Sequence, residues 1–198
     1  MSRDDVVLQR PEDIRFVLPV FHTAGACPGA VTAYLLRRIA YRAGAYAPGI
    51  QELIFHELNT SGQGGTIERV QRWFQARASM LQQLAYRVQC RRVATDTQVL
   101  IDWVKAGRGY RGVMLLTDYK TLHPEPDAAG DVRPEQVQHA VGVTVDRLDA
   151  AGDESLVMID PYPGAAGAKD RCDVHPKIEE AHRGRNFHGL IYYWSGWS

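Results

Sequence analysis

The sequence predicts a single α+β domain in which N-terminal helices pack on a C-terminal antiparallel β-sheet. Apolar residues recur with a helical period in the first part of the chain, about 20–107, whereas short apolar runs between turn residues fill the second part, about 110–198. Helices first and strands second is typical of an α+β arrangement rather than of alternating βαβ units. The chain of 198 residues is long enough to bury one substantial core, so we expect one domain over 1–198.

Composition and charge narrow the class of protein. Lys plus Arg and Asp plus Glu each number 23, so the net charge is zero and no electrostatic argument favours a nucleic acid or a membrane surface as partner. Three widely spaced cysteines are unlike a disulfide framework and indicate a reducing compartment. The acidic start, Met1 to Asp5, lacks the features of a secretory signal. We expect a cytoplasmic protein, and its arginine-rich, alanine-rich usage indicates a bacterial source.

The first predicted helix runs from about Pro28 to Arg42. Proline suits the first position of a helix because its missing N–H would have no partner there. Four residues share the inward face of this helix: Val31, Tyr34, Leu35 and Ile39. Gly44 is the predicted end, since glycine adopts the left-handed conformation that terminates helices. Cys27 directly precedes the helix, where unpaired backbone N–H groups and the helix dipole stabilise a thiolate.

Two further helices follow in the first part of the chain. The longer one is predicted from Thr66 to about Arg92, because the helical period continues for more than five turns. Its periodic residues are Val70, Trp73, Phe74, Arg77, Met80, Leu81, Leu84 and Val88. The shorter one is predicted over 98–105, capped by Asp96 and ended by Gly107. Its inward residues are predicted to be Val99, Leu100, Trp103 and Val104.

The apolar pattern then changes to that of strands. Four short apolar runs are predicted as strands: 112–117, 139–145, 155–160 and 189–194. A polar turn over 146–154 joins the second strand to the third, so we expect these two to pair as an antiparallel hairpin.

A glycine-rich loop separates the first two long helices. After a short helical segment at 51–58, the chain has its loosest composition, centred on Gly62, Gln63, Gly64 and Gly65. We interpret this stretch as a lid or substrate loop beside the cysteine. The run lacks the lysine and the Ser/Thr of a phosphate-binding loop, so a nucleotide is not expected here.

Three short motifs stand in a recognisable order. Cys27 opens a helix, His139 opens the strand His-Ala-Val-Gly-Val, and Asp160-Pro161 closes the next strand. Together with the helix, glycine and strand over 102–116, this order resembles the papain-like cysteine peptidase fold. The resemblance is closest to its compact bacterial branch, the double-glycine peptidases that process bacteriocin leaders. It covers most of the chain and depends on these short motifs.

This resemblance implies a cysteine-dependent hydrolase or acyltransferase that acts on an amide, ester or thioester through an acyl-enzyme. Cys27 would be the nucleophile, His139 the general base and then acid, and Asp160 the group that orients the imidazole. No cofactor is implied. The expected substrate is a peptide or a small acyl compound, including one bound to a carrier. Peptidase, acyltransferase and an inactive, papain-like binding module all remain open on the sequence.

One position departs from the family pattern. The family has a glutamine six residues before the nucleophile, which donates its amide to the oxyanion hole, and here that residue is Phe21. His22 is therefore the candidate oxyanion donor, with the backbone N–H of Cys27 and another group as the alternative. The family's glycine after the cysteine is also displaced, because Pro28 stands there.

Two other classes of function are weighed against this one. A zinc site would use Cys172, His175, His182 and His188, but the segment has no paired C-x-x-C and is rich in charged residues, so we predict no metal. A non-catalytic partner module would use the aromatic C-terminal segment. Trp197 is hard to bury there and favours a subunit contact, as in a homodimer.

Overall fold

The computed structural model of the chain describes residues 27–45, 57–58, 67–118, 138–147, 154–159 and 187–198. The helices are α3 (Cys27–Arg42), α5 (Ile67–Gln83) and α6 (Thr97–Ala106). The strands are β1 (Val88–Thr95), β2 (Arg111–Asp118), β3 (Gln138–Arg147), β4 (Glu154–Ile159) and β5 (Phe187–Trp194). Helices packed against an antiparallel sheet are the α+β arrangement that the sequence predicted.

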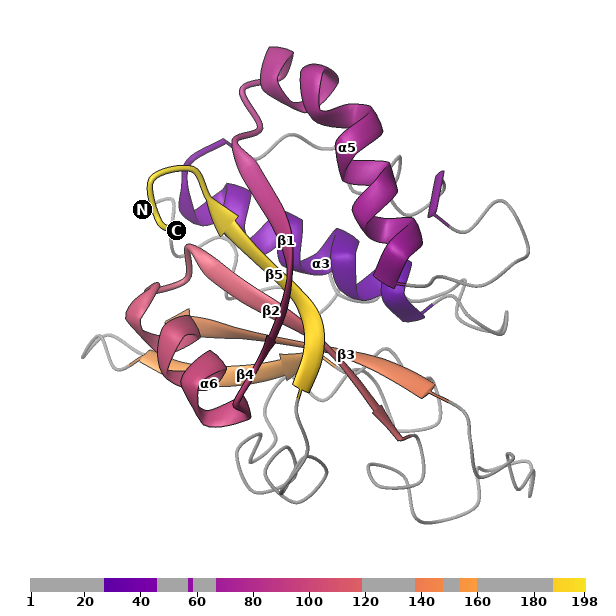
Figure 1. Cartoon of the computed structure of the whole chain (residues 1–198). Coiled ribbons are helices and arrows are strands. Elements are labelled where there is room, and N and C mark those ends of the chain that lie inside the picture. The colour runs from indigo at the N-terminus through magenta and orange to yellow at the C-terminus, as the bar shows by residue number, and fades with distance from the viewer. Residues whose placement is uncertain (1–26, 46–56, 59–66, 119–137, 148–153, 160–186) are drawn as a thin grey trace, which may run out of the picture.

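The described strands form one five-stranded sheet with the order β1-β5-β2-β3-β4. Every neighbouring pair is antiparallel, including the predicted hairpin of β3 and β4. The last strand in the chain, β5, lies between β1 and β2 (Figure 1). The four predicted strands are therefore confirmed, and β1 is a fifth that was not predicted.

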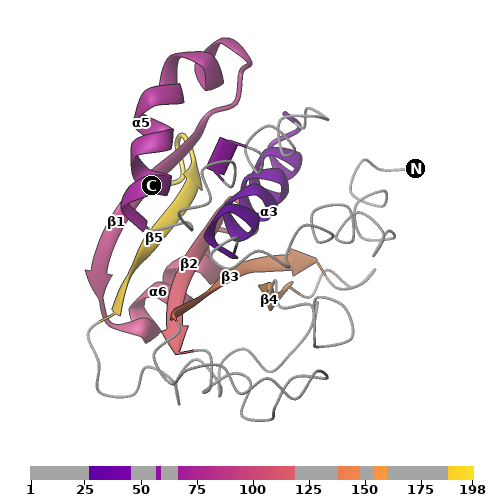
Figure 2. The same ribbon diagram turned by 90° about the vertical axis from the view of Figure 1, so that its right-hand side faces the viewer.

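Helices cover both faces of the sheet (Figure 2). Successive residues of a strand point to opposite faces, so each strand contributes to two cores. Along β2, Met114 belongs to the core beneath α3 and α5, while Val113 and Leu115 belong to the core beneath α6. This burial on both sides explains why the strands read as continuous apolar runs in the sequence.

A glycine lets α3 lie close to the sheet. At Gly112 in β2, an added Cβ would stand 2.9 Å from Leu35 Cδ2 and 3.3 Å from the carbonyl oxygen of Val143. Real Cβ atoms hardly ever approach other atoms so closely, so a side chain here would push the helix away. The four predicted inward residues of α3 are all buried, and Gly44 has the predicted left-handed φ of 70°.

Two buried hydroxyl groups tie α3 to its neighbours. The Oγ1 of Thr32 and the phenol oxygen of Tyr192 in β5 are 2.9 Å apart. The phenol of Tyr86 donates to the carbonyl oxygen of Leu36 at 2.9 Å. Burial holds the pKa of Tyr192 well above its ordinary value, aided by the nearby Cys90 and opposed by the bond to Thr32. Tyr192 is thus a neutral, structural hydroxyl that fixes the helix on the sheet.

The predicted helix up to Arg92 is wrong beyond residue 83. Ala85 adopts a left-handed φ of 56°. The N–H of Tyr86 donates to the carbonyl oxygen of Leu81 at 2.8 Å, and the N–H of Ala85 donates to the carbonyl oxygen of Gln82 at 3.0 Å. These two bonds form a Schellman motif, which ends a helix. Because alanine rather than glycine occupies the left-handed position, no residue type at this point indicates the end of a helix.

The residues after this turn form β1, so the region 20–107 is not purely helical. Val88 continues the helical period of α5, yet it pairs with Trp194 of β5, and Cys90 pairs with Tyr192. In α6 the cap Asp96 and the end at Gly107 are confirmed. Val99 was predicted to face inward and is wrong, because its side chain is 57% exposed.

We predict that Ala85→Gly raises the stability of the protein by about 0.5–1 kcal/mol, because a left-handed conformation is unfavourable for alanine and free for glycine. Urea unfolding followed by circular dichroism measures the change. Ala76→Gly, at an exposed position in the middle of α5, is the control and should lower stability by about 1 kcal/mol. Equal losses in both variants would contradict the assignment of the turn.

Candidate functional site

Helix α3 runs antiparallel to β2 across one face of the sheet. Its last residue, Arg42, donates from Nε to the carbonyl oxygen of Arg108 at 3.1 Å, just before β2 begins. Midway along the helix, Leu35 lies against Gly112 near the start of β2. The start of α3 therefore lies toward the end of the sheet at which β2 finishes (Figure 1). Cys27 is the first residue of this helix.

His139 lies at that same end of the sheet. It is the second residue of β3 and pairs with Thr117, the last residue but one of β2. Antiparallel pairing thus brings the start of β3 beside the end of β2. The helix of Cys27 and the strand of His139 therefore both begin at one end of the layer that α3 makes with the sheet, although 112 positions separate the two residues in the chain (139 − 27).

Strand β4 returns toward this end. It pairs with β3 and finishes at Ile159, opposite Gly142. Asp160 follows Ile159 in the sequence and lies outside the described residues. The predicted oxyanion donor His22 and the predicted loop residues 62–65 also lie outside them.

The start of α3 carries partial positive charge. The helix has 16 residues, a length of about 24 Å, and its first turn carries no acidic residue. The dipole of such a helix places this charge at its first turn, and no carboxylate of that turn offsets it.

The described residues offer no alternative metal centre. Within these ranges, no group of three or more His, Cys, Asp or Glu residues could hold a metal ion. Of the zinc candidates, His188 belongs to β5, and Cys172, His175 and His182 lie outside the described residues. Among the described helices, none combines the length and the apolar character needed to cross a membrane.

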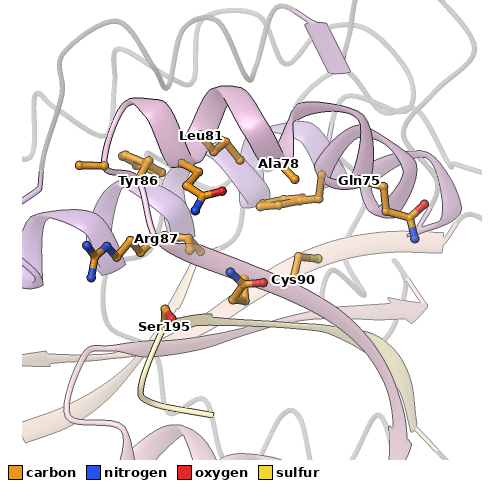
Figure 3. A pocket seen from close by; sticks show the side chains of 12 residues that line it. Gln75, Ala78, Leu81, Tyr86, Arg87, Cys90 and Ser195 are labelled. Atoms are coloured by element: carbon orange, nitrogen blue, oxygen red, sulfur yellow. The ribbon is translucent and has the colours of Figure 1, made fainter.

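A cavity of about 700 Å³ opens between α5 and β1 (Figure 3). Its lining comes from the C-terminal half of α5, the turn after it, the start of β1 and Ser195. The sequence did not predict this cavity, because it depends on the turn at Ala85 that reverses the chain. A glycine at position 85 would have indicated this turn in the sequence.

Cys90 lies at this cavity. It is a free thiol, and burial raises its pKa far above the ordinary value of a cysteine. The thiol therefore stays protonated at neutral pH and is a poor nucleophile.

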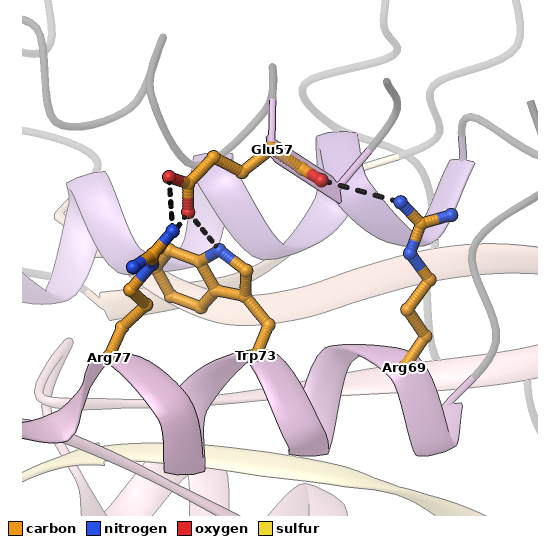
Figure 4. Close-up of polar contacts among 4 residues, drawn as sticks. All are labelled: Glu57, Arg69, Trp73 and Arg77. Atoms are coloured by element: carbon orange, nitrogen blue, oxygen red, sulfur yellow. Dashed lines mark hydrogen bonds and ion pairs between the residues drawn. The ribbon is translucent and has the colours of Figure 1, made fainter. Parts of the chain in front are cut away.

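Glu57 fastens the segment before α5 to one face of that helix (Figure 4). Its carboxylate accepts from Nε1 of Trp73 at 2.6 Å and from Nε and Nη2 of Arg77 at 2.9 and 2.7 Å. Its backbone carbonyl accepts from Nη2 of Arg69 at 3.3 Å. These three donors are four residues apart, so they share one helix face. Leu58, the next residue, is 1% exposed, which anchors the same point of the chain.

No protein-family model matches the chain, and no curated protein is found to be similar to it. The papain-like resemblance therefore depends on the sequence motifs alone.

We predict that Glu57→Gln lowers stability by about 1–2 kcal/mol, because Trp73 and Arg77 lose a charged acceptor that is largely shielded from water. Thermal unfolding and the emission of the tryptophans measure the effect. Glu68→Gln is the matched control, since the Glu68 to Arg92 pair is about half exposed and contributes under about 0.5 kcal/mol. A loss at Glu57 no larger than at Glu68 would contradict the anchoring role.

Proposed function

We propose that this protein is a cysteine-dependent hydrolase or acyltransferase that acts on an amide, ester or thioester, with Cys27 as nucleophile. The observation that carries the proposal is the direction of α3 relative to the sheet. Because α3 is antiparallel to β2, and β3 is antiparallel to β2 as well, the start of α3 and the start of β3 face the same end. A cysteine and a histidine stand at these two starts.

The proposed reaction has two halves. The Cys27 thiolate attacks the substrate carbonyl, and a protonated His139 gives its proton to the leaving amine, alcohol or thiol as the carbon–heteroatom bond breaks. Neutral His139 then takes a proton from water or from another acceptor, which attacks the thioester and releases Cys27 as a thiolate. The acceptor decides whether the product is an acid or a transferred acyl group.

Two further groups complete this proposal. Asp160 is proposed to accept a hydrogen bond from the imidazole and to hold it in the tautomer that faces the cysteine. The direction of β4 supports this role, since the strand runs toward the end of the sheet where β3 starts and finishes at Ile159, opposite Gly142. His22, or the backbone N–H of Cys27, is proposed to donate to the oxyanion.

Thiol alkylation tests the proposal without knowledge of the substrate. With iodoacetamide at pH 7, we expect Cys27 to react at least about tenfold faster than Cys90, because a thiolate reacts and a buried protonated thiol does not. Mass spectrometry of peptides that contain Cys27, Cys90 and Cys172 measures the three rates. His139→Ala should slow only Cys27.

A matched variant separates catalysis from a general effect on folding. His188→Ala removes another strand histidine that has no proposed role in catalysis, and it should leave the rate of Cys27 unchanged. Equal rates for the three cysteines, or an equal effect of the two histidine variants, would discard the nucleophile and favour the inactive binding module.

A further inference from the structure

We infer that the cavity between α5 and β1 binds a small organic carboxylate with an apolar body. This inference goes beyond the proposed reaction and does not depend on it. A volume of about 700 Å³ is within the range of small-molecule sites, which span about 300–1,000 Å³. The cavity has an apolar floor and a polar rim, an arrangement typical of such sites.

The floor consists of buried apolar side chains from both elements. Phe74 and Leu81 of α5 are 7% and 3% exposed, and Val88 of β1 is 4% exposed. Cys90 adds a neutral thiol to the same floor, because burial keeps it protonated. A ligand with an apolar chain or ring would lie against the parts of this floor that open to the cavity and exclude water from them.

The rim carries one charge, and that charge is positive. Arg87 is the only ionised side chain at neutral pH among the residues that line the cavity, and the lining has no carboxylate. Within the described part of the chain, no ion pair or hydrogen bond engages its guanidinium group. The other polar groups of the rim are the amides of Gln75, Gln82 and Gln89 and the hydroxyl of Ser195.

This distribution selects the class of ligand. A single guanidinium group matches a single carboxylate through two parallel N–H···O bonds, whereas the neutral amides and the hydroxyl supply further donors. A cationic ligand would meet Arg87 without any compensating acid. A neutral apolar ligand would leave Arg87 and the amides unused.

The cavity is separate from the end of the sheet where Cys27 lies. The N–H of Ser195 bonds to the carbonyl of Arg87 at 2.8 Å, and Tyr86 contacts α3 at Leu36. These residues lie beside the start of β1 and the end of β5. That end of the sheet is also where β2 starts and where the last turns of α3 lie. A ligand at this cavity would therefore not occupy the proposed catalytic position.

Three matched ligands test the inference on the full chain by isothermal titration calorimetry at pH 7. Octanoate has the charge and the apolar body, octanamide has the body alone, and acetate has the charge alone. We expect saturable 1:1 binding of octanoate, and at least about tenfold weaker binding of the other two. Absence of saturable octanoate binding, or equal binding of octanamide, would overturn the inference.

Three variants locate the site. Arg87→Gln should weaken octanoate binding about tenfold, whereas Arg91→Gln, at an exposed arginine of β1 outside the lining, should leave it unchanged. Ala78→Phe, at an exposed lining position of α5, should fill the cavity and abolish binding while the protein stays folded. Equal effects of the two arginine variants, or unchanged binding in Ala78→Phe, would also overturn the inference.

Discussion

The contact between α3 and β2 at Gly112 is the constraint on which the rest of the structure depends. The absence of a side chain there lets Leu35 approach the strand backbone, and the bond between Thr32 and Tyr192 holds the helix at that height. A helix that sits so close can bury its inner face on the sheet, as the buried Val31, Leu35 and Ile39 do. Its direction, and with it the location of Cys27, follows from this contact and from Arg42 at the far end.

The turn at Ala85 is the second decisive feature, because it ends α5 and lets the chain continue as β1, an edge strand of the sheet. The buried Tyr86 links this turn to α3 through the carbonyl of Leu36, so the turn and the helix are fixed to each other. β1 then runs back beneath α5, and the space between them is left open as the cavity. One local conformation thus creates both the fifth strand and the candidate ligand site.

The surroundings of Cys90 determine the chemistry of its thiol. Cys90 belongs to a buried apolar floor, and loss of hydration favours the neutral thiol. Such a thiol suits the wall of a binding cavity. Cys27 opens α3, whose first turn has no acidic residue, and its role as a nucleophile remains a prediction.

The sequence by itself determined the helices and strands that depend only on the periodicity of apolar residues and on capping residues close to them. The inner face of α3, the cap Asp96, the stop at Gly107 and four of the five strands follow from side-chain pattern and capping chemistry within a few residues. The order Cys27, His139, Asp160 is likewise a property of the sequence, and the catalytic proposal built on it remains a prediction.

Only the tertiary structure decided the features that depend on contacts between distant residues. Val88 at the start of β1 continues the helical period of α5, and pairing of β1 with β5, about a hundred residues later, selected the strand. Val99 has an apolar side chain, yet it lies on the outer face because Leu100, Ile101 and Val104 already fill the core beneath α6. Local pattern fixes which residues can be buried, and the packing of distant elements chooses among them, because burial is a property of the assembled core.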